Sequence, residues 1–254
     1  MDQRSKDNTA LENIYSRKSV RLFEKRPVSE PDRAAILRAA LEAPSPANMS
    51  LYTIIEITDQ ELKNRTASLC HGQVFIGEAP MVLLFAADFK KWNDFFHIYA
   101  PDSRTPGLGD MMLAWEDSYI AMQNAVTAAW ALGIGSCYIG HVIEHYEETR
   151  ELFGLPDYVV PTGLLVFGYP TEKQLAREKF SHFQWEDMVC ENRYREKSPE
   201  KFRAMLEERQ KKSGKDFDTW AKKFTELKWQ GDFREEMGRS VRAMMDAWLK
   251  GRPY

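Results

Sequence analysis

The amino-acid sequence predicts a three-layer sandwich of the α+β or α/β class, in which helices cover a sheet. Four short runs of β-branched or apolar residues indicate strands, and periodic segments between them indicate helices. These segments follow one another without a strict βαβ rhythm, so nothing indicates a regular doubly wound sheet. Of the 254 residues, 43% are hydrophobic and 29% are charged, which is enough apolar surface for a sizeable core.

The N-terminal part of the chain predicts two helices and a strand. Residues 7–16 have helical character and end at the basic pair Arg17-Lys18. Ser29 is suited to cap a second helix, with Asp32 in the capping-box position. That helix stops at Pro44, because a residue before proline leaves the α region. The β-branched run at 51–58 then predicts the first strand.

The middle of the chain predicts three more strands and two helices. Residues 81–87 are continuously apolar, which predicts a strand buried on both faces. Further strands are expected at 134–140 and 159–167, and helices at 110–132 and 144–153. The first of these helices is rich in small residues, which indicates close packing in the centre of the molecule or against a partner helix; these residues are Ala121, Ala125, Ala128 and Ala129.

The C-terminal region, residues 191–239, is rich in Lys, Arg and Glu but also carries large apolar side chains. We expect two helices there, from Pro199 to Glu208 and from Asp218 to Leu227, with a turn at Ser213-Gly214. The apolar groups are too many to leave in water, so this extension is expected to cover the core or a second subunit. They are Phe202, Leu206, Phe217, Trp220, Phe224, Leu227 and Trp229.

Charge and cysteine content exclude several classes of protein. The 35 Lys and Arg against 38 Asp and Glu give a net charge of −3, too balanced for a protein that coats nucleic acid by charge alone. Cys70, Cys137 and Cys190 are widely spaced, so neither a disulfide framework nor a CxxC metal site follows. The first residues lack the apolar segment of a signal peptide, and no apolar run approaches a bilayer span. We expect a cytoplasmic protein with no membrane partner.

Two segments suit a flat, anionic ligand. Arg17, Ser19 and Arg21 alternate, so an extended backbone would direct all three side chains one way, and Lys18 adds a further cation. Arginine forks beside a hydroxyl suit a phosphate monoester, although a solvated helix C-terminus would also be basic. Residues 43–49 have no large side chain before Met49. Backbone amides there can approach a planar ligand, but a plain proline-broken connection explains the segment equally well.

Two later segments give weaker signals. Residues 133–141 do not match GxGxxG, which disfavours a dinucleotide site. A strand that ends at Gly140 can nevertheless pass close to a flat ring, the alternative being a core strand that contains glycine. Arg177 and Lys179 follow Gly168-Tyr169-Pro170 and would face one way if extended. For this pair, an exposed charged stretch is the simpler interpretation.

No side chain stands out as a catalytic group. The motifs HExxH, GxSxG, CxxC and the P-loop are absent. His141 and His145 are four residues apart, but no carboxylate or cysteine cluster completes a site, so we expect a helix surface pair and no metal. Cys137 lies in an apolar strand and is expected to be an inert thiol. This pattern suits an enzyme whose cofactor carries the chemistry.

From about residue 11 to residue 180 the chain resembles the nitroreductase family of FMN-dependent, NAD(P)H-oxidising enzymes. Within that family it is most similar to the branch of NADPH-preferring oxygen-insensitive nitroreductases and flavin reductases. Residues 17–23 resemble the family's (H/R)-x-S-x-R-x-(F/Y) phosphate motif, and residues 43–48 resemble its A-P-S-x-x-N flavin loop. Further matches are Gln73, Gln123-Asn124-Ala125, Ala128-Ala129, Leu132-Gly133-Ile134-Gly135, Tyr138-Ile139-Gly140 and Gly168-Tyr169-Pro170.

The resemblance implies an α+β fold with a mixed sheet flanked by helices, in an intertwined homodimer. It also implies one domain over residues 1–254, with a helical extension from about residue 190. FMN would lie at the dimer interface with contacts from both chains. The family's Lys-x-Arg pair is inverted here, which keeps the charge. The implied FMN-binding residues are Arg17, Lys18, Ser19, Arg21, Pro44, Ser45, Pro46, Ala47, Asn48, Gln73, Tyr138, Ile139, Gly140, Arg177 and Lys179.

The implied reaction is ping-pong: NAD(P)H reduces the flavin, and a nitroaromatic, a quinone or a free flavin then accepts the electrons. Lys18 or Arg21 would stabilise the reduced ring. A basic loop near residues 209–215 meets the 2′-phosphate of NADPH in this branch, which makes Lys211, Lys212 and Lys215 candidates, although a solvated loop is the alternative. Two rival functions are a reductive dehalogenase-like enzyme of the same fold and a non-catalytic flavin carrier or sensor.

Overall fold

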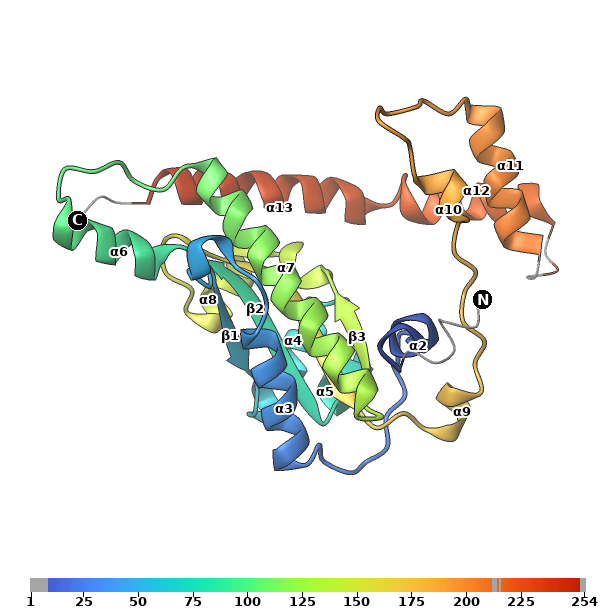
Figure 1. Cartoon of the computed structure of the whole chain (residues 1–254), viewed down its shortest axis with the longest axis horizontal. Coiled ribbons are helices and arrows are strands. Elements are labelled where there is room, and N and C mark those ends of the chain that lie inside the picture. The colour runs from blue at the N-terminus through green and yellow to red at the C-terminus, as the bar shows by residue number, and fades with distance from the viewer. Residues whose placement is uncertain (1–8, 212–213, 215, 252–254) are drawn as a thin grey trace. The chain divides into compact units, whose positions relative to one another are not determined.

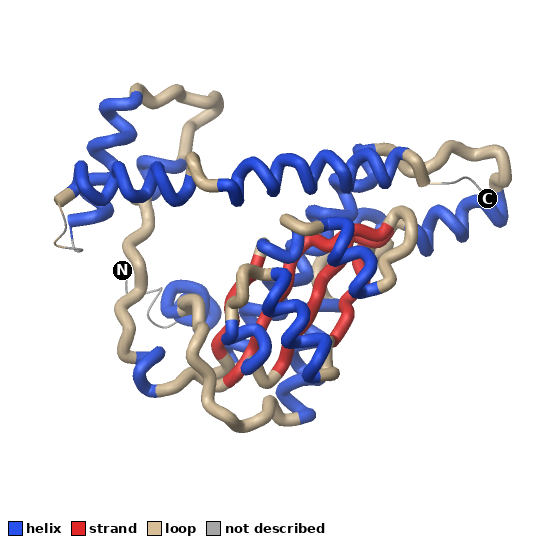
Figure 2. Tube along the Cα trace, turned by 180° about the vertical axis from the view of Figure 1, so that it is seen from behind, coloured by secondary structure: helices blue, strands red, loops and turns tan. Residues whose placement is uncertain are grey.

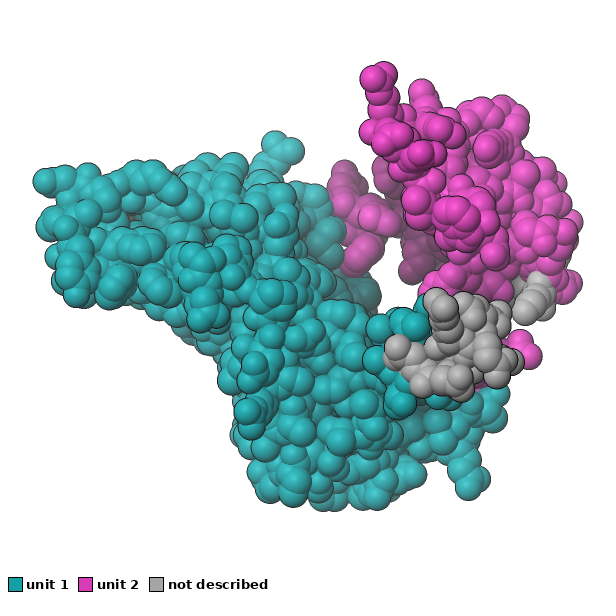
Figure 3. All heavy atoms as spheres, viewed as in Figure 1, with its two compact units in different colours: residues 1–176, 236–254 teal, residues 177–235 magenta. Residues whose placement is uncertain are grey.

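The computed structural model describes residues 9–211, 214 and 216–251 (Figure 1). The described chain forms two compact units, which Figure 3 colours separately. One is made of residues within 1–176 and 236–254, and the other of residues within 177–235. The first unit contains the sheet. Among the described residues, no helix combines the length and the apolar character that crossing a membrane requires.

The sheet has the strand order β1-β2-β4-β3, and the four predicted strands are confirmed. All neighbouring pairs are antiparallel, so the expectation of a mixed sheet is wrong for these strands. The reason is that β1 and β2 are joined at one end of the sheet and β3 and β4 at the other, so that the strands of each pair run in opposite directions. All eight residues of β2 are buried, as expected for an interior strand. The bounds are β1 Tyr52–Glu56, β2 Met81–Asp88, β3 Gly135–Ile139 and β4 Val159–Gly168.

Helices pack on both faces of the sheet, which confirms the α+β sandwich (Figure 2). Alternate residues of β2 enter different clusters of buried side chains: Leu83 packs with residues of α3 and α7, and Leu84 with residues of α4, α5, α8 and α13. The helix bounds are α3 Glu30–Leu41, α4 Gln60–Leu69, α5 Val74–Glu78, α7 Leu108–Ala131, α8 Tyr146–Phe153 and α13 Asp232–Leu249. The first unit also contains α2 Thr9–Ser16, α6 Lys90–Tyr99 and α9 Glu172–Leu175, with 3-10 turns η1 Pro46–Asn48 and η2 His141–Ile143.

Local sequence signals explain where α3 begins and how α7 packs. The Ser29 side chain accepts a hydrogen bond from the Asp32 backbone N–H at 3.3 Å, which confirms the predicted N-cap. Ala121, Ala125 and Ala129 of α7 are fully buried in the cluster that includes α3 and the sheet. The small residues of α7 therefore allow close packing inside the molecule. This was one of the two interpretations of the sequence, the other being packing against a partner helix.

The second unit contains α10 (Trp185–Met188), α11 (Pro199–Gln210) and α12 (Phe217–Lys228), so both predicted tail helices are confirmed. Aromatic rings make local contacts there, with Trp220 and Phe224 stacked at 5.0 Å. None of the described residues between 177 and 235 is buried, however, and the Trp229 side chain is 73% exposed. That much apolar surface is expected to lie against another surface, so its burial on the core or a second subunit stays a prediction.

Candidate functional site

The segment that follows α2 lies along the edge strand β3 and carries the first predicted motif. The Val20 backbone N–H donates to the Ser136 carbonyl at 2.9 Å, and Ser19 forms an isolated parallel bridge with Ser136. Gln174 of α9 holds the same segment. Its Oε1 accepts from the Arg21 backbone N–H and its Nε2 donates to the Ser19 carbonyl, both at 3.3 Å. The backbone of residues 19–21 is thus held by two elements, the strand β3 and the helix α9.

Gly135 allows this close approach because it has no side chain. A Cβ atom at Gly135 would lie 2.4 Å from Val20 Cγ2, and Val20 is fully buried. Gly135→Ala is therefore expected to displace residues 19–21 from β3. We expect it to lower the free energy of unfolding by about 1–3 kcal/mol, the usual cost of overpacking, as measured by urea unfolding.

Gly109→Ala is the matched control for that variant. Gly109 lies in α7, and no atom lies within 4 Å of a Cβ built there. Gly109 is the second residue of α7, where alanine fits without strain and restricts the unfolded chain more than glycine does, so this variant should keep or slightly raise the stability. Equal stability of the two alanine variants would contradict the role assigned to the Val20 contact.

The cations of the motif separate in space. Lys18 Nζ donates to the Leu175 carbonyl of α9 at 2.5 Å. The Arg21 guanidinium carbon lies 6.0 Å from the centroid of the Phe75 ring in α5. Lys18 therefore extends toward α9 and Arg21 toward α5. Arg17 has a buried Nη1 atom with no hydrogen-bond partner. A buried, unpaired guanidinium nitrogen is costly unless an anion pairs with it, so the observation fits a phosphate site.

The end of β3 is open beside this segment. No atom lies within 4 Å of a Cβ built on Gly140, which leaves room for a flat ring. Tyr138 Oη donates to Gln123 Oε1 at 3.1 Å, and burial raises the pKa of Tyr138 to about 12, so the phenol stays protonated. Gln73 caps α5, and its Nε2 lies 3.3 Å from His141 Nδ1, beside Gly140. The structure therefore brings Gln73 and the end of β3 together.

The second predicted motif, residues 43–48, connects α3 to β1. Ala47 and Asn48 have φ values of 48° and 58°, in the left-handed region that side chains other than glycine rarely adopt. Asp117 of α7 stabilises this connection: its Oδ2 accepts from Ser45 Oγ at 2.8 Å and from the Leu51 backbone N–H at 2.6 Å. The segment is thus a defined turn with its peptide groups near the surface, because Pro44, Pro46, Ala47 and Asn48 are exposed.

The two motifs lie at opposite edges of the sheet. Residues 19–21 accompany β3, whereas residues 43–48 lead into β1, and β2 and β4 lie between these two strands. Three strand spacings amount to about 14 Å. Figure 1 likewise shows α2 beside β3 and far from the connection between α3 and β1. One chain therefore does not bring the two motifs together.

The remaining predicted binding residues belong to the second unit. Arg177 and Lys179 are exposed and follow α9. Lys211 follows α11 as its C-cap and forms an ion pair with Glu208 three residues earlier. Lys212 and Lys215 lie outside the described residues. The roles of all five remain predictions.

The expectation for the histidines is wrong in two respects. His141 opens η2, whereas His145 precedes α8 as its N-cap, so they do not share a helix surface. A carboxylate does lie beside His145, although His141 is not part of the group: Glu144 Oε2 lies 2.7 Å from His71 Nε2, and His71, Glu144 and His145 form a cluster with potential ligand atoms within 4.8 Å of one another. Sequence reasoning missed His71 because it is 73 residues from Glu144 along the chain.

Two other residues of the site also escaped sequence reasoning. Gln174 holds the backbone of residues 19 and 21, and no local pattern distinguishes it from the other polar residues after Pro170. The sequence does contain a signal for Asp117, because a charged residue four positions before Ala121 falls on the apolar face of the helix, where it needs a polar partner. The expected inertness of Cys137 agrees with its environment, because burial raises the pKa of this thiol.

An α+β sandwich with a cationic segment on one edge strand, an open strand end beside it and no activated nucleophile among the described residues is the architecture expected of a cofactor-dependent enzyme. The family model described as the nitroreductase family matches residues 14–169. The chain therefore belongs to the nitroreductase family, whose members are NAD(P)H-dependent flavin oxidoreductases.

Individual relatives agree with this assignment. An FMN reductase [NAD(P)H] of Bacillus subtilis is 32% identical over 175 residues, which cover 68% of this chain and 70% of the relative. An oxygen-insensitive NADPH nitroreductase of Salmonella typhimurium is 31% identical over 185 residues, 72% of this chain and 74% of the relative. Nitroreductase A from Vibrio parahaemolyticus has the same fold, with a TM-score of 0.80 at 24% identity over 94% of this chain and 98% of that one.

Proposed function

We propose that this protein is an FMN-dependent oxidoreductase that uses NADPH or NADH to reduce nitroaromatics, quinones or flavins. The observation that carries the proposal is the buried Nη1 of Arg17, which has no partner in a cationic segment on the edge of the sheet. This nitrogen needs an anion, and a terminal phosphate supplies one. The open end of β3 at Gly140 supplies the adjoining space for a ring.

We assign different residues to the phosphate and to the ring of the cofactor. Arg17 and Ser19 would bind the phosphate, together with Arg177 and Lys179 if these follow the family pattern. Arg21 extends toward α5, where Gln73 lies, so we assign Arg21 rather than Lys18 to the ring side. Lys18 instead donates to the Leu175 carbonyl, which ties residue 18 to α9.

When bound, FMN would supply the redox chemistry, taking hydride from NAD(P)H and giving electrons to an acceptor that enters the same site afterwards. The protein's part is to orient and to stabilise charge. The Arg21 guanidinium would oppose the negative charge that develops on the ring carbonyl side. No side chain has to act as nucleophile, and the raised pKa of Cys137 keeps that thiol protonated.

We further propose that the working unit is a homodimer with two shared sites. Residues 17–21 and 43–48 lie at opposite edges of one sheet, so one chain cannot present both to the same flavin. A second chain related by twofold symmetry can place its own residues 44–48 beside the first chain's β3. The exposed aromatic residues of the second unit are consistent with a large apolar interface, which in obligate dimers exceeds about 2,000 Å².

Steady-state oxidation of NADPH and NADH tests the proposed activity. The purified protein should be yellow with one FMN per chain, and oxidation should accelerate when menadione, nitrofurazone or free FMN is added. A protein that binds FMN yet oxidises nicotinamide no faster than free FMN would instead be a carrier or sensor. Turnover restricted to halogenated aromatics would favour the reductive dehalogenase-like alternative.

The preference for NADPH is predicted to depend on Lys211 and Lys212. A 2′-phosphate near two lysines gains about 1–3 kcal/mol, or roughly tenfold to a hundredfold in KM. The double variant Lys211→Ala/Lys212→Ala should therefore lose kcat/KM for NADPH and keep it for NADH. Lys222→Ala/Lys223→Ala, on exposed positions of α12, is the matched control. Equal falls for both nicotinamides would show that these lysines do not contact the phosphate.

A further inference from the structure

A second group of polar side chains lies in the first unit, outside residues 17–21 and beside His141, whose ring centroid is 5.0 Å from that of His71. His71, Glu144 and His145 bring two imidazoles and one carboxylate together, with potential ligand atoms within 4.8 Å of one another. The His71 and Glu144 side chains meet at 2.7 Å between Nε2 and Oε2. The Glu144 side chain is only 3% exposed, whereas that of His71 is 51% exposed. The cluster is thus anchored by a buried carboxylate and open to solvent on one side.

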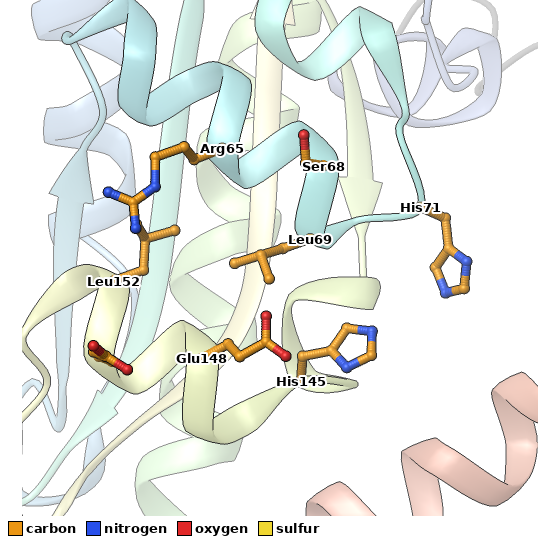
Figure 4. Close-up of a pocket in the computed structure, with 8 residues that line it drawn as sticks. Arg65, Ser68, Leu69, His71, His145, Glu148 and Leu152 are labelled. Carbon is orange, nitrogen blue, oxygen red and sulfur yellow. The ribbon is translucent and has the colours of Figure 1, made fainter.

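Three separate elements present these residues. His71 follows α4 in a left-handed conformation with a φ of 58°, Glu144 follows η2 as its C-cap, and His145 is the N-cap of α8. A cavity of about 580 Å³ lies beside the two histidines, lined also by Arg65, Ser68, Leu69 and Glu148 (Figure 4). The site is therefore assembled by tertiary structure and accessible to a small ion.

We propose that His71, Glu144 and His145 bind a divalent transition-metal ion, with Zn²⁺ as the reference ion. Imidazole nitrogen with one carboxylate oxygen is a ligand set that favours Zn²⁺ and its neighbours over Mg²⁺ or Ca²⁺, which prefer oxygen ligands. Three protein ligands leave a further coordination position, which the open side of the cluster provides for water. This inference does not depend on the proposed flavin chemistry.

The surrounding charges favour a cation. Glu148 lines the cavity, and Glu236 Oε1 lies 3.6 Å from His145 Nδ1, although Glu236 also pairs with Arg239. Arg65 is the opposing charge on the cavity wall. A buried carboxylate is stable only when it has a partner, and in this structure Glu144 has His71 as its partner. A bound metal ion would take the place of the contact between His71 and Glu144, and His145 would become its third ligand.

Small side-chain movements suffice to close the site. Tetrahedral Zn²⁺ with bonds of about 2.0–2.2 Å places its ligand atoms about 3.3–3.5 Å apart. This spacing falls between the 2.7 Å from His71 Nε2 to Glu144 Oε2 and the 4.8 Å within which all the potential ligand atoms lie. His71 is on an exposed turn and the His145 side chain is 31% exposed, so both rings have space to rotate toward Glu144. The buried carboxylate can stay in place.

Zinc binding to the full chain tests the proposal. After equilibrium dialysis against Zn²⁺, elemental analysis should find one ion per chain. Glu144→Gln and His71→Asn each remove one ligand, and we expect each to weaken the affinity at least about tenfold. Asparagine tolerates the left-handed backbone at residue 71, so that variant keeps the fold even if Glu144→Gln does not. His182→Ala, which removes an exposed histidine outside the cluster, should bind as the wild type does.

A stability measurement gives a second, independent readout. A ligand that binds only the folded state raises the unfolding temperature, so Zn²⁺ should raise it in the wild type and in His182→Ala but not in His71→Asn. FMN content, measured on the same samples, reports separately on the proposed function. Absence of bound Zn²⁺ in the wild type, or equal affinity in all variants, would mean that the cluster is only a hydrogen-bonded histidine–glutamate pair, and would overturn the proposal.

Discussion

Arg17→Ala is expected to leave the purified protein largely free of FMN. Arg17 has a buried Nη1 without a partner, so the free protein already bears the cost of an unpaired nitrogen that a phosphate would satisfy. A charge-assisted hydrogen bond of this kind contributes about 1.5–3 kcal/mol, which corresponds to about a tenfold to 150-fold change in Kd. Arg21→Ala should have a comparable effect, with the loss of the cation near α5.

The ratio of flavin to protein absorbance after dialysis measures this effect, and quenching of FMN fluorescence gives the Kd. Arg38→Ala is the matched control, because Arg38 is an exposed arginine of α3 whose ion pair with Glu42 lies on the helix surface. It should retain FMN as the wild type does. Full FMN content in both Arg17→Ala and Arg21→Ala would remove the basis of the phosphate site. A colourless wild type that FMN cannot reconstitute would overturn the whole functional proposal.

Two variants that are each inactive are expected to restore a site when they are combined in one dimer. Arg17→Ala removes a phosphate contact at the β3 edge. Asn48→Asp keeps the left-handed turn at the opposite edge and replaces an amide donor with a carboxylate. If each site takes residues 17–21 from one chain and residues 44–48 from the other, a mixed dimer has one intact site and one doubly altered site. It should hold about half of the wild-type FMN content, since twofold symmetry generates two sites.

Co-expression with two different tags and sequential purification isolates the mixed dimer. Its FMN content and its NADPH oxidation should both exceed those of either parental homodimer. A mixed dimer of Arg17→Ala with Arg21→Ala is the matched control, because both changes affect the same half of the site and no intact site forms. If the combination of Arg17→Ala with Asn48→Asp stays empty, or if the protein sediments as a monomer that retains FMN, the shared site is disproved.

Short-range patterns in the sequence were enough to predict the local elements of this protein. The apolar run at 81–87 predicts a strand buried on both faces, and β2 is such a strand, because side chains that alternate between two apolar faces leave no polar position. Ser29 and Asp32 predict the start of α3, because capping involves only neighbouring backbone groups. The family could also be predicted from the sequence, because its motifs are short and keep their order along the chain. The match of the nitroreductase family model to residues 14–169 confirms this prediction.

The tertiary structure was needed to establish which segments of the chain lie together. Strand order depends on packing between residues far apart in the chain, and so the sequence did not reveal that residues 17–21 and 43–48 occupy opposite edges of an antiparallel sheet. The same reason explains the missed support of Ser45 by Asp117 and the missed cluster of His71, Glu144 and His145, whose members come from distant segments. Hydrogen-bonding patterns within a helix or turn are encoded locally, whereas contacts between elements are selected by burial of the whole core.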